Sequence, residues 1–248
     1  KRIDCERENN SNARFFTVNN PDSIRIGREF NRQATIYRSY YPTVVPDTIL
    51  YKQVDKIYDI VYCAKITREK GIEDLIEAVR ILKVKFDKIQ VAIIGGGSEY
   101  YVHYVQSLVE RYGLGGNFIF KGFLSEHKEI FQVIARSKIF VLPTYFDNFL
   151  GSIREAMLMK VPFLSYAIDG ISFINENREC IALAEKQNVR DLANKIFEML
   201  SDAMKSASFV DNAFDLMTSQ FSNEAIYTGL IDIYQDIHGH KFPLSSNV

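Results

Sequence analysis

The run Ile57-Tyr-Asp-Ile-Val-Tyr-Cys-Ala64 consists largely of apolar and aromatic side chains, which is typical of a buried strand. Apolar positions at three- and four-residue steps follow in residues 71–86 and predict an amphipathic helix. A second strand is expected at Val91–Ile94, where the chain continues into Gly95-Gly96-Gly97. A strand, a helix and a second strand in this order predict the start of a parallel sheet.

The same alternation continues to residue 200. Further strands are expected at Phe118–Phe120, Ile139–Leu142, Pro162–Tyr166 and Cys180–Ala184, with helices at Ser98–Tyr112, Glu126–Ala135, Ser152–Met159 and Val189–Leu200. This pattern predicts a doubly wound α/β domain, a parallel sheet with helices on both faces, which we place at residues 49–220. Because ligands bind such sheets at the carboxyl ends of the strands, site residues are expected in the loops that follow them.

Two shorter segments flank this domain. In residues 1–48, a strand at Ala13–Val18 and a helix at Ser23–Phe30 precede an irregular stretch, so this part is one β-α unit, too small to form its own core. In residues 221–248, an amphipathic helix is expected at Asn223–Ile237, before a loose tail. Because the sequence lacks an initiator Met, we expect it to begin inside a longer gene product.

The composition excludes several classes of protein. A net charge of -1 gives no reason to expect nucleic acid as a partner. Three cysteines in 248 residues are too few for a disulfide framework or a zinc cluster. No apolar run approaches the roughly 18 residues of a membrane span, and the polar first fifteen residues do not resemble a secretory signal.

Lys65 and Lys70 flank the turn between the first strand and its helix. At the carboxyl end of a strand, two ammonium groups could neutralise a diphosphate. The structural alternative is an ordinary charged turn in water, because Lys is usually exposed.

The glycine run at residues 95–97 also follows a strand and opens a helix. A dinucleotide-binding fingerprint would need a third glycine at position 100, which is Tyr100, so the oxidoreductase interpretation fails on its own motif. Glycine would still permit a tight turn and a close approach of backbone, with or without a ligand.

Asp147 and Glu155 bracket a turn that runs into a helix. Carboxylates can accept hydrogen bonds from sugar hydroxyls, and the free N–H groups of a helix N-terminus bind phosphate. The structural alternative is a capping box, in which Ser152 caps the helix and Glu155 reciprocates. That alternative does not explain Asp147. The four histidines show no metal-ligand spacing, and no Gly-x-Ser-x-Gly motif indicates a serine hydrolase.

Four groups of residues occur in a fixed order: Lys65 with Lys70-Gly71, Gly95-Gly96-Gly97, Phe120-Lys121-Gly122, and Pro143 with Asp147 and Glu155-Ala156-Met157. This order resembles the nucleotide-sugar-binding C-terminal domain of retaining GT-B glycosyltransferases over residues 57–237. By the same resemblance, residues 13–30 correspond to the last β-α unit of the N-terminal domain, most of which would be absent. The closing helix would be the one that crosses back to that domain.

The resemblance implies a role for each site residue. Lys65 and Lys70 match a basic pair that binds the donor diphosphate, and Asp147 matches a carboxylate that contacts the donor sugar; these three are the catalytic candidates. Glu155 matches the residue that binds the ribose. The remaining donor-binding candidates are Gly96, Leu124, Phe149, Leu150, Gly151 and Ser152. No side chain is a convincing nucleophile or general base, which the family does not need, because the leaving phosphate is thought to assist the acceptor.

The chain departs from the family at several positions. Lys65 replaces the usual Arg, Asp147 the usual Glu and Leu150 the usual Gly, while Phe173 stands where an acidic residue is usual. These departures motivate an alternative, a non-catalytic nucleotide-sugar-binding or scaffold module on the same fold. A sugar-nucleotide epimerase is a third hypothesis, although the sequence offers no obvious acid-base pair for it.

The resemblance also implies partners. The substrate would be a nucleoside-diphosphate sugar, with no metal and no other cofactor, and the acceptor would be a glycan or a lipid-linked molecule bound through the missing domain. Such an enzyme of polysaccharide biosynthesis would be cytoplasmic, and peripheral contact with the inner face of a membrane is compatible with it.

Overall fold

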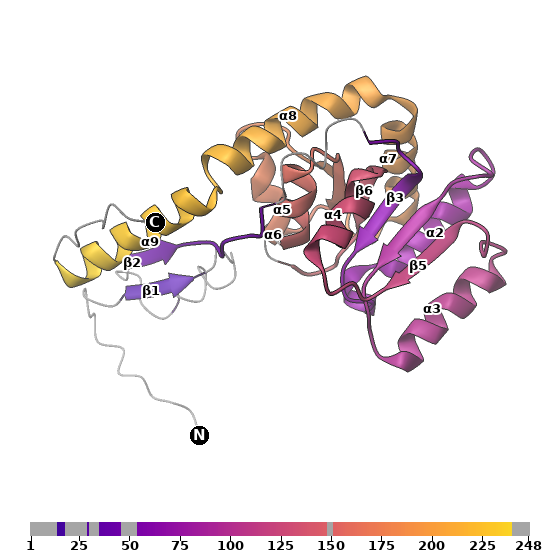
Figure 1. Ribbon diagram of the computed structural model, residues 1–248, viewed down its shortest axis with the longest axis horizontal. Helices are drawn as coiled ribbons and strands as arrows, with labels where there is room; N and C mark the ends of the chain where they lie inside the picture. Colours follow the sequence, from indigo (N-terminus) through magenta and orange to yellow (C-terminus); the bar gives the residue numbers. More distant parts are fainter. Residues whose placement is uncertain (1–13, 18–28, 30–34, 46–53, 148–150, 240–248) are drawn as a thin grey trace. The chain divides into compact units, whose positions relative to one another are not determined.

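The computed structural model describes residues 14–17, 29, 35–45, 54–147 and 151–239 (Figure 1). The chain divides into two compact units, one formed by residues 43–218 and the other by residues 1–42 together with 219–248. The larger unit holds a six-stranded sheet and carries every residue that the sequence nominated for a site.

All neighbouring strands of this sheet are parallel. The strands are β3 (Tyr58–Cys63), β4 (Val91–Ile94), β5 (Phe118–Gly122), β6 (Ser137–Leu142), β7 (Phe163–Tyr166) and β8 (Ala182–Ala184). Their order is β5-β4-β3-β6-β7-β8, so the first strand of the unit lies in the middle, with Val61 beside Ala92 on one side and Phe140 on the other. This is a doubly wound strand order, in which the chain changes direction between β3 and β6.

Helices cover both faces of the sheet. The helices are α2 (Ile72–Leu82), α3 (Glu99–Arg111), α4 (His127–Ala135), α5 (Gly151–Leu158), α6 (Asp169–Ser172), α7 (Val189–Ser201) and α8 (Ala203–Ser219). Right-handed crossovers that progress in opposite directions from β3 and β6 place α2 on one face and α5 on the other. In Figure 1, α4 and α5 lie in front of the sheet, whereas α7 packs with α2 on the other side. The predicted doubly wound α/β fold is confirmed.

The core explains why the central strands read as unbroken apolar runs. Residues of β4 and β7, and those of β6 apart from Lys138, are buried on both faces, because each face carries helices. Leu75, Ile76 and Val79 of α2 are fully buried. Burying each such side chain contributes about 1.5–3 kcal/mol, so the helix is held mainly by its apolar face.

Several elements differ from the sequence prediction. Helix α8 was not predicted, nor was the short α6 with its continuing 3-10 turn at Phe173–Asn175. Helix α2 ends at Leu82, four residues earlier than expected, and residues 83–85 form turns instead. The helix after β6 already includes Gly151, one residue before the expected start at Ser152.

The smaller unit has two parallel strands, β1 (Arg14–Thr17) and β2 (Thr35–Arg38), and the helix α9 (Asn223–His238). β2 corrects the sequence prediction, which treated residues 31–48 as irregular. The predicted helix at Ser23–Phe30 lies outside the described residues, apart from Glu29, which is helical. Helix α9 is capped as its sequence suggests, because the Ser222 hydroxyl accepts a hydrogen bond from the N–H of Ala225 at 3.1 Å.

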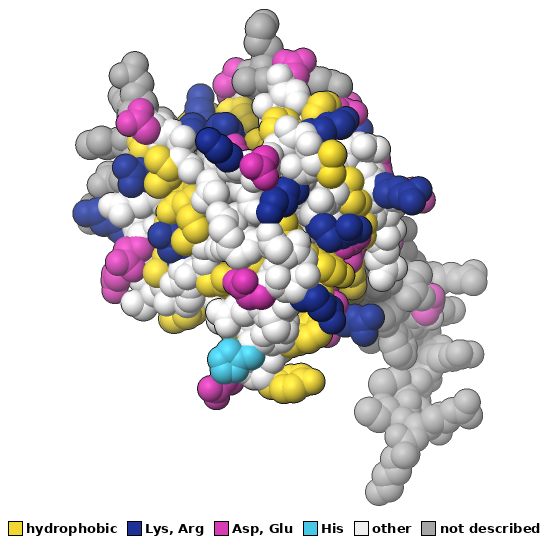
Figure 2. Space-filling model, turned by 90° about the vertical axis from the view of Figure 1, so that its right-hand side faces the viewer, with side chains coloured by type: hydrophobic (Ala, Val, Ile, Leu, Met, Phe, Trp, Pro, Cys, Tyr) yellow, Lys and Arg dark blue, Asp and Glu magenta, His cyan; other side chains and the backbone are white. Residues whose placement is uncertain are grey.

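The surface mixes charges of both signs. Figure 2 shows Lys and Arg side chains interspersed with acidic and hydrophobic ones on one face of the molecule. Within the described part of the chain, no helix combines the length and the apolarity that crossing a bilayer requires.

Candidate functional site

The candidate site lies where the sheet changes direction, at the carboxyl ends of β3 and β6. The loop after β3 carries a 3-10 turn at Arg68–Lys70, which Gly71 ends in a left-handed conformation, at φ 70°. A Cβ atom at Gly71 would lie 1.9 Å from the carbonyl oxygen of Pro143, in the loop after β6. Only glycine therefore lets these two loops approach so closely.

Backbone bonds tie the same two loops together. The N–H of Tyr145 donates to the carbonyl oxygen of Glu69 at 2.8 Å. The buried hydroxyl oxygen of Thr144 lies 3.1 Å from the carbonyl oxygens of both Glu69 and Phe146, and 3.4 Å from Asp147 Oδ2. These bonds fix the segment that carries Asp147 against the turn that carries Lys70.

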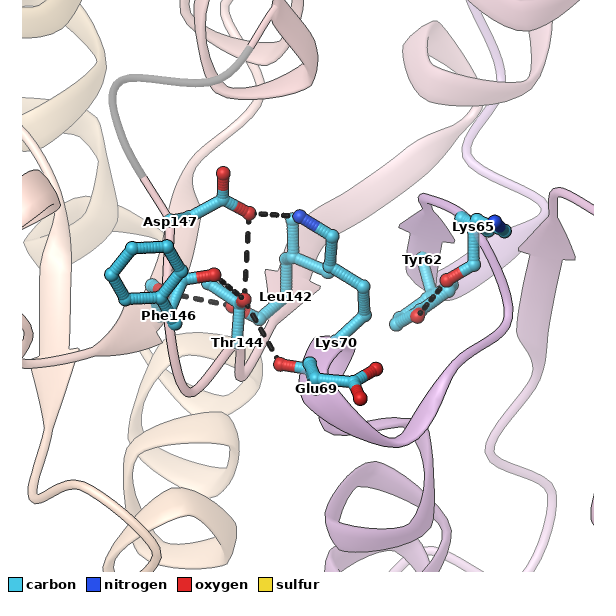
Figure 3. A network of polar contacts seen from close by, with 9 residues as sticks. Tyr62, Lys65, Glu69, Lys70, Leu142, Thr144, Phe146 and Asp147 are labelled. Atoms are coloured by element: carbon cyan, nitrogen blue, oxygen red, sulfur yellow. Dashed lines mark hydrogen bonds and ion pairs between the residues drawn. The ribbon is translucent and has the colours of Figure 1, made fainter. Parts of the chain in front are cut away.

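Lys70 and Asp147 form an ion pair across this junction (Figure 3). The exposed fractions of their side chains are 21% and 11%, so water screens the pair only partly. The structure thus brings together two of the predicted residues, 77 positions apart in the chain, in direct contact.

Lys65 lies at the same end of the sheet, but its side chain is exposed, and Figure 3 shows it turned away from the Lys70–Asp147 pair. Its carbonyl oxygen accepts a hydrogen bond from the hydroxyl of Tyr62 at 3.2 Å. Tyr62 is fully buried, and burial raises the pKa of its hydroxyl, with further increases from Tyr101, Cys63 and Asp147. The Tyr62 hydroxyl is therefore a permanent donor that holds the start of the loop.

The glycine run packs against this loop. A Cβ atom at Gly95 would lie 1.9 Å from the carbonyl oxygen of Ala64, and one at Gly97 would lie 2.4 Å from that of Ile66. The carbonyl oxygen of Gly96 accepts a hydrogen bond from the N–H of Ile66 at 2.8 Å. Packing against the chain explains Gly95 and Gly97, whereas Gly96 would leave a Cβ in ordinary contact with Phe123, at 3.6 Å.

Glu155 occupies the second turn of α5 and is nearly buried, with 11% of its side chain exposed. Its Oε1 atom lies 3.6 Å from Nδ1 of His127, the first residue of α4. Burial raises the pKa of the Glu155 carboxyl, while His127 and Arg154 oppose the increase. Ser152 lies inside the helix and cannot be its N-cap, so the capping-box alternative for Ser152 and Glu155 is wrong.

Cys63, at the end of β3, lies close enough to Glu155 for the carboxylate charge to affect the pKa of its thiol. Burial and then the Glu155 carboxylate raise the pKa of the Cys63 thiol to about 12. The thiol is therefore neutral at physiological pH.

The structure describes only some of the remaining donor-binding candidates. Leu124 is half-buried in the loop between β5 and α4. Gly151 is the first residue of α5, and a Cβ there would meet open space. Phe149 and Leu150 lie outside the described residues.

Sequence reasoning missed the residues that support the site. Asp74 of α2 accepts hydrogen bonds from the hydroxyls of Tyr166 and Tyr145, and it thereby links α2 to the end of β7 and to the loop after β6. The spacing of the histidines indicates no metal site, and it does not show that His127 lies beside Glu155. Position in the chain does not reveal either contact, because both join elements far apart in sequence.

In the ranges that the structure describes, no three or more His, Cys, Asp or Glu side chains are grouped so that they could hold an ion.

Known proteins resemble this chain in sequence and in fold. Residues 51–215 match the sequence profile of the family described as glycosyl transferases group 1. A 2-deoxystreptamine N-acetyl-D-glucosaminyltransferase of Niallia circulans is 22% identical over 175 residues, which cover 71% of this chain and 44% of that protein. A poly(ribitol-phosphate) alpha-N-acetylglucosaminyltransferase of Staphylococcus aureus is 24% identical over 184 residues, 73% of this chain and 36% of that one. The chain thus spans less than half the length of these relatives.

Solved structures show the same fold. A variant of TarM from S. aureus, in a complex that includes UDP, superimposes with a TM-score of 0.76 at 20% identity, over 90% of this chain and 44% of that one. HepE of Anabaena with UDP has a TM-score of 0.75 at 18% identity, over 91% and 63%. The C-terminal domain of LpcC, a glycosyl transferase group 1 family protein of Francisella tularensis, has a TM-score of 0.61 at 22% identity, over 74% and 96%.

Proposed function

The chain belongs to the glycosyl transferases group 1 family, and we propose that it binds the nucleoside-diphosphate-sugar donor of a retaining GT-B glycosyltransferase. The observation that carries this proposal is the contact between Lys70 and Asp147 at the carboxyl ends of β3 and β6. It places a cation suited to a diphosphate beside a carboxylate suited to sugar hydroxyls, at the position where doubly wound sheets bind ligands.

The residues around this pair suggest how the donor lies. Lys70, with Lys65 on the same loop, would neutralise the diphosphate. The N-terminus of α5 at Gly151 would offer free N–H groups and open space to the phosphates. Glu155, one turn further along α5, would accept hydrogen bonds from the ribose hydroxyls, close to the loop that carries Leu124.

In the proposed reaction, the bond between the anomeric carbon of the sugar and the diphosphate oxygen breaks, and its electron pair leaves with the diphosphate. The acceptor hydroxyl oxygen bonds to the anomeric carbon on the same face, and its proton passes to the leaving phosphate. Lys70 and Lys65 would stabilise the negative charge that develops on the diphosphate, which supplies the electrostatic part of catalysis without a metal.

The whole protein's chemistry is proposed on the same basis. The acceptor would be a glycan or a lipid-linked molecule, held by an N-terminal domain of which residues 1–48 are a part, and the reaction would take place on the cytoplasmic side. UDP-N-acetylglucosamine is the first donor to test, because two similar proteins are named as N-acetylglucosaminyltransferases and several structural neighbours were solved with UDP.

Calorimetry with nucleotides tests donor binding. We expect UDP or another nucleoside diphosphate to bind the protein, and Glu155→Ala to weaken that affinity by about ten- to hundredfold, the effect of losing a charge-assisted hydrogen bond. Wild type should also bind UDP more tightly than 2′-deoxy-UDP, and Glu155→Ala should lose most of that preference. Asp87→Asn, an exposed change between α2 and β4 at the other end of the sheet, is the matched control. Equal affinities of wild type and Glu155→Ala for UDP would contradict the proposed contact of Glu155 with the ribose.

A second candidate function is a non-catalytic module that binds nucleotide sugars. The observation that favours it is the exposed side chain of Lys65, which is turned away from the Lys70–Asp147 pair and so does not add its charge to that of Lys70. Turnover of a radiolabelled donor by the protein with its complete N-terminal domain separates the two functions. Transfer or donor hydrolysis supports the enzyme, whereas binding without either supports the module.

A further inference from the structure

Glu155 and His127 face each other from different helices, α5 and α4, with 3.6 Å between Oε1 of the carboxylate and Nδ1 of the imidazole. We propose that His127 is a positioning residue, which keeps the Glu155 carboxylate ionised and in place to accept hydrogen bonds from the ribose of the donor. The result is a preference for ribonucleotides over 2′-deoxyribonucleotides. This inference rests on the proposed function, because it requires a nucleoside diphosphate with its ribose at Glu155.

The first step concerns what the ribose requires. Its 2′- and 3′-hydroxyl groups can both donate hydrogen bonds, and an ionised carboxylate only accepts them, so the two groups match. A protonated carboxyl would present an O–H donor to the ribose and weaken this match. Because only 11% of the Glu155 side chain is exposed, burial raises the pKa of its carboxyl and works against the form that the ribose requires.

The second step compares the three groups that are electrostatically coupled to this carboxylate. The Cys63 thiol on β3 is neutral, because its own pKa is raised to about 12. Arg154 and His127 both lower the pKa of the Glu155 carboxyl, and His127 has the larger effect. Consecutive residues of a helix do not face each other, so Arg154 is poorly placed to orient the carboxylate. His127 reaches it from another helix and can do both.

The third step is that His127 is held in place but remains open to water. It is the first residue of α4, and its ring lies against that of Phe131, one turn further on, with the ring centroids 5.9 Å apart. The exposed fraction of the His127 side chain is 51%. The imidazole therefore attracts the carboxylate without being buried with it, which avoids the desolvation cost of a second buried charge.

Calorimetry tests this with the tightest-binding of UDP, GDP and ADP and with the 2′-deoxy form of the same nucleotide. The ratio of the two affinities cancels effects on the diphosphate, which both nucleotides carry. At about pH 6, within the range in which imidazoles carry charge, we expect His127→Gln to reduce this ratio about three- to fivefold, the upper part of the range for one partly exposed ion pair. His127→Lys, which restores a cation, should retain most of the ratio. His103→Gln, at an exposed histidine of α3, is the matched control and should not change it.

The dependence on pH distinguishes this role from a merely structural one. Because His127 lowers the pKa of the Glu155 carboxyl, its removal should make that carboxyl protonate at a higher pH. The preference for the ribonucleotide is present above that pH and is lost below it. As the pH is lowered, His127→Gln should therefore lose the preference at a higher pH than wild type does, and the same profile for both proteins would contradict the inference.

The outcomes separate this inference from the proposed function. In a Glu155→Gln background, His127→Gln should not reduce the ratio further, because His127 acts through the carboxylate. A further reduction there, or equal losses of affinity for both nucleotides, overturns the inference and leaves donor binding intact. If wild type binds none of UDP, GDP and ADP, the proposed function fails and this inference with it. Thermal unfolding checks that each variant folds, and His127→Asn, which also removes the imidazole, should reproduce the loss seen with His127→Gln.

Discussion

Asp74 on α2 accepts a hydrogen bond from the hydroxyl of Tyr166 at 2.6 Å, across 92 positions of the chain. Tyr145 donates to the same carboxylate, and the rings of the two tyrosines stack with their centroids 6.1 Å apart. One carboxylate therefore holds both the end of β7 and the loop that leads to Asp147. This anchor is independent of the backbone bond from Tyr145 to Glu69.

Tyr145→Phe should loosen this loop without disturbing the core. We expect it to lower the free energy of unfolding by about 0.5–1.5 kcal/mol, the usual effect of one lost hydrogen bond. Because the loop positions Asp147 for the sugar, affinity for UDP-N-acetylglucosamine should fall more than affinity for UDP. Urea denaturation and calorimetry measure the two effects. An equal loss of affinity for both ligands would show that Tyr145 does not act through the position of Asp147 at the sugar.

Gly71→Ala should be far more damaging than its size suggests. The new methyl group would lie 1.9 Å from the carbonyl oxygen of Pro143, in a backbone conformation of φ 70° that side chains rarely adopt. We expect a loss of about 3 kcal/mol or more in unfolding free energy, since strain and backbone movement add together. The control is Gly116→Ala, where a Cβ would meet no atom within 4 Å. If the two variants unfold at the same urea concentration, the close approach of the two loops is not needed.

Glu155 should make stability depend on pH. Burial raises the pKa of its carboxyl above the ordinary 4.5, so the folded state favours the protonated form. The stability that this provides is complete below the unfolded-state pKa and is lost as pH rises through the folded-state pKa. Glu155→Gln, which mimics the protonated form, should therefore unfold at a higher temperature than wild type at pH 7, and the difference should shrink towards pH 4.5.

The effect of Glu155→Gln on the unfolding temperature should also be measured in a His127→Gln background. The His127→Gln substitution removes the imidazole that lies 3.6 Å from Glu155. Because the imidazole opposes the increase in the pKa of Glu155, the difference at pH 7 should be larger without it. A difference that does not vary with pH in either background would contradict the role of burial.

Cys63 should react slowly with alkylating reagents. Its thiol pKa of about 12 leaves almost no thiolate at pH 8, and only the thiolate is nucleophilic. We expect its carbamidomethylation by iodoacetamide, followed by peptide mass spectrometry, to be at least about tenfold slower than that of a free cysteine of pKa near 8.5. Glu155→Gln removes a charge that raises the pKa, so Cys63 should react faster in that variant.

Much of the fold could be predicted because parallel strands that are buried on both faces are continuous apolar runs in the sequence. β3, β4 and β6 are apolar runs between polar loops, and the structure has them within two residues of the expected bounds. The helices α3 and α7 were predicted as closely, since Ser98 and Asn188 cap them by accepting from the N–H groups of Tyr101 and Asp191.

The rest depends on contacts that no local pattern contains. Helix α8 was not predicted from the sequence because its apolar residues are interrupted by Ser, Asn and Asp, which are weak helix formers. Lys70 and Asp147 could be nominated separately, but their contact follows from the pairing of β3 with β6, strands that lie more than 70 residues apart. The positions of Asp74 and His127 beside the site follow from the same tertiary packing.

The pairing of β3 with β6 makes the central seam of the sheet also the floor of the candidate site. The strands up to β5 extend from one side of that seam and those from β6 onward extend from the other, so neither half contains a complete site. A ligand held across the seam would bind only the folded domain, and its binding free energy would add to the global stability rather than to that of one loop. Occupancy would then slow amide exchange in β4 and β7, which no ligand need touch, as much as in the loops that hold it.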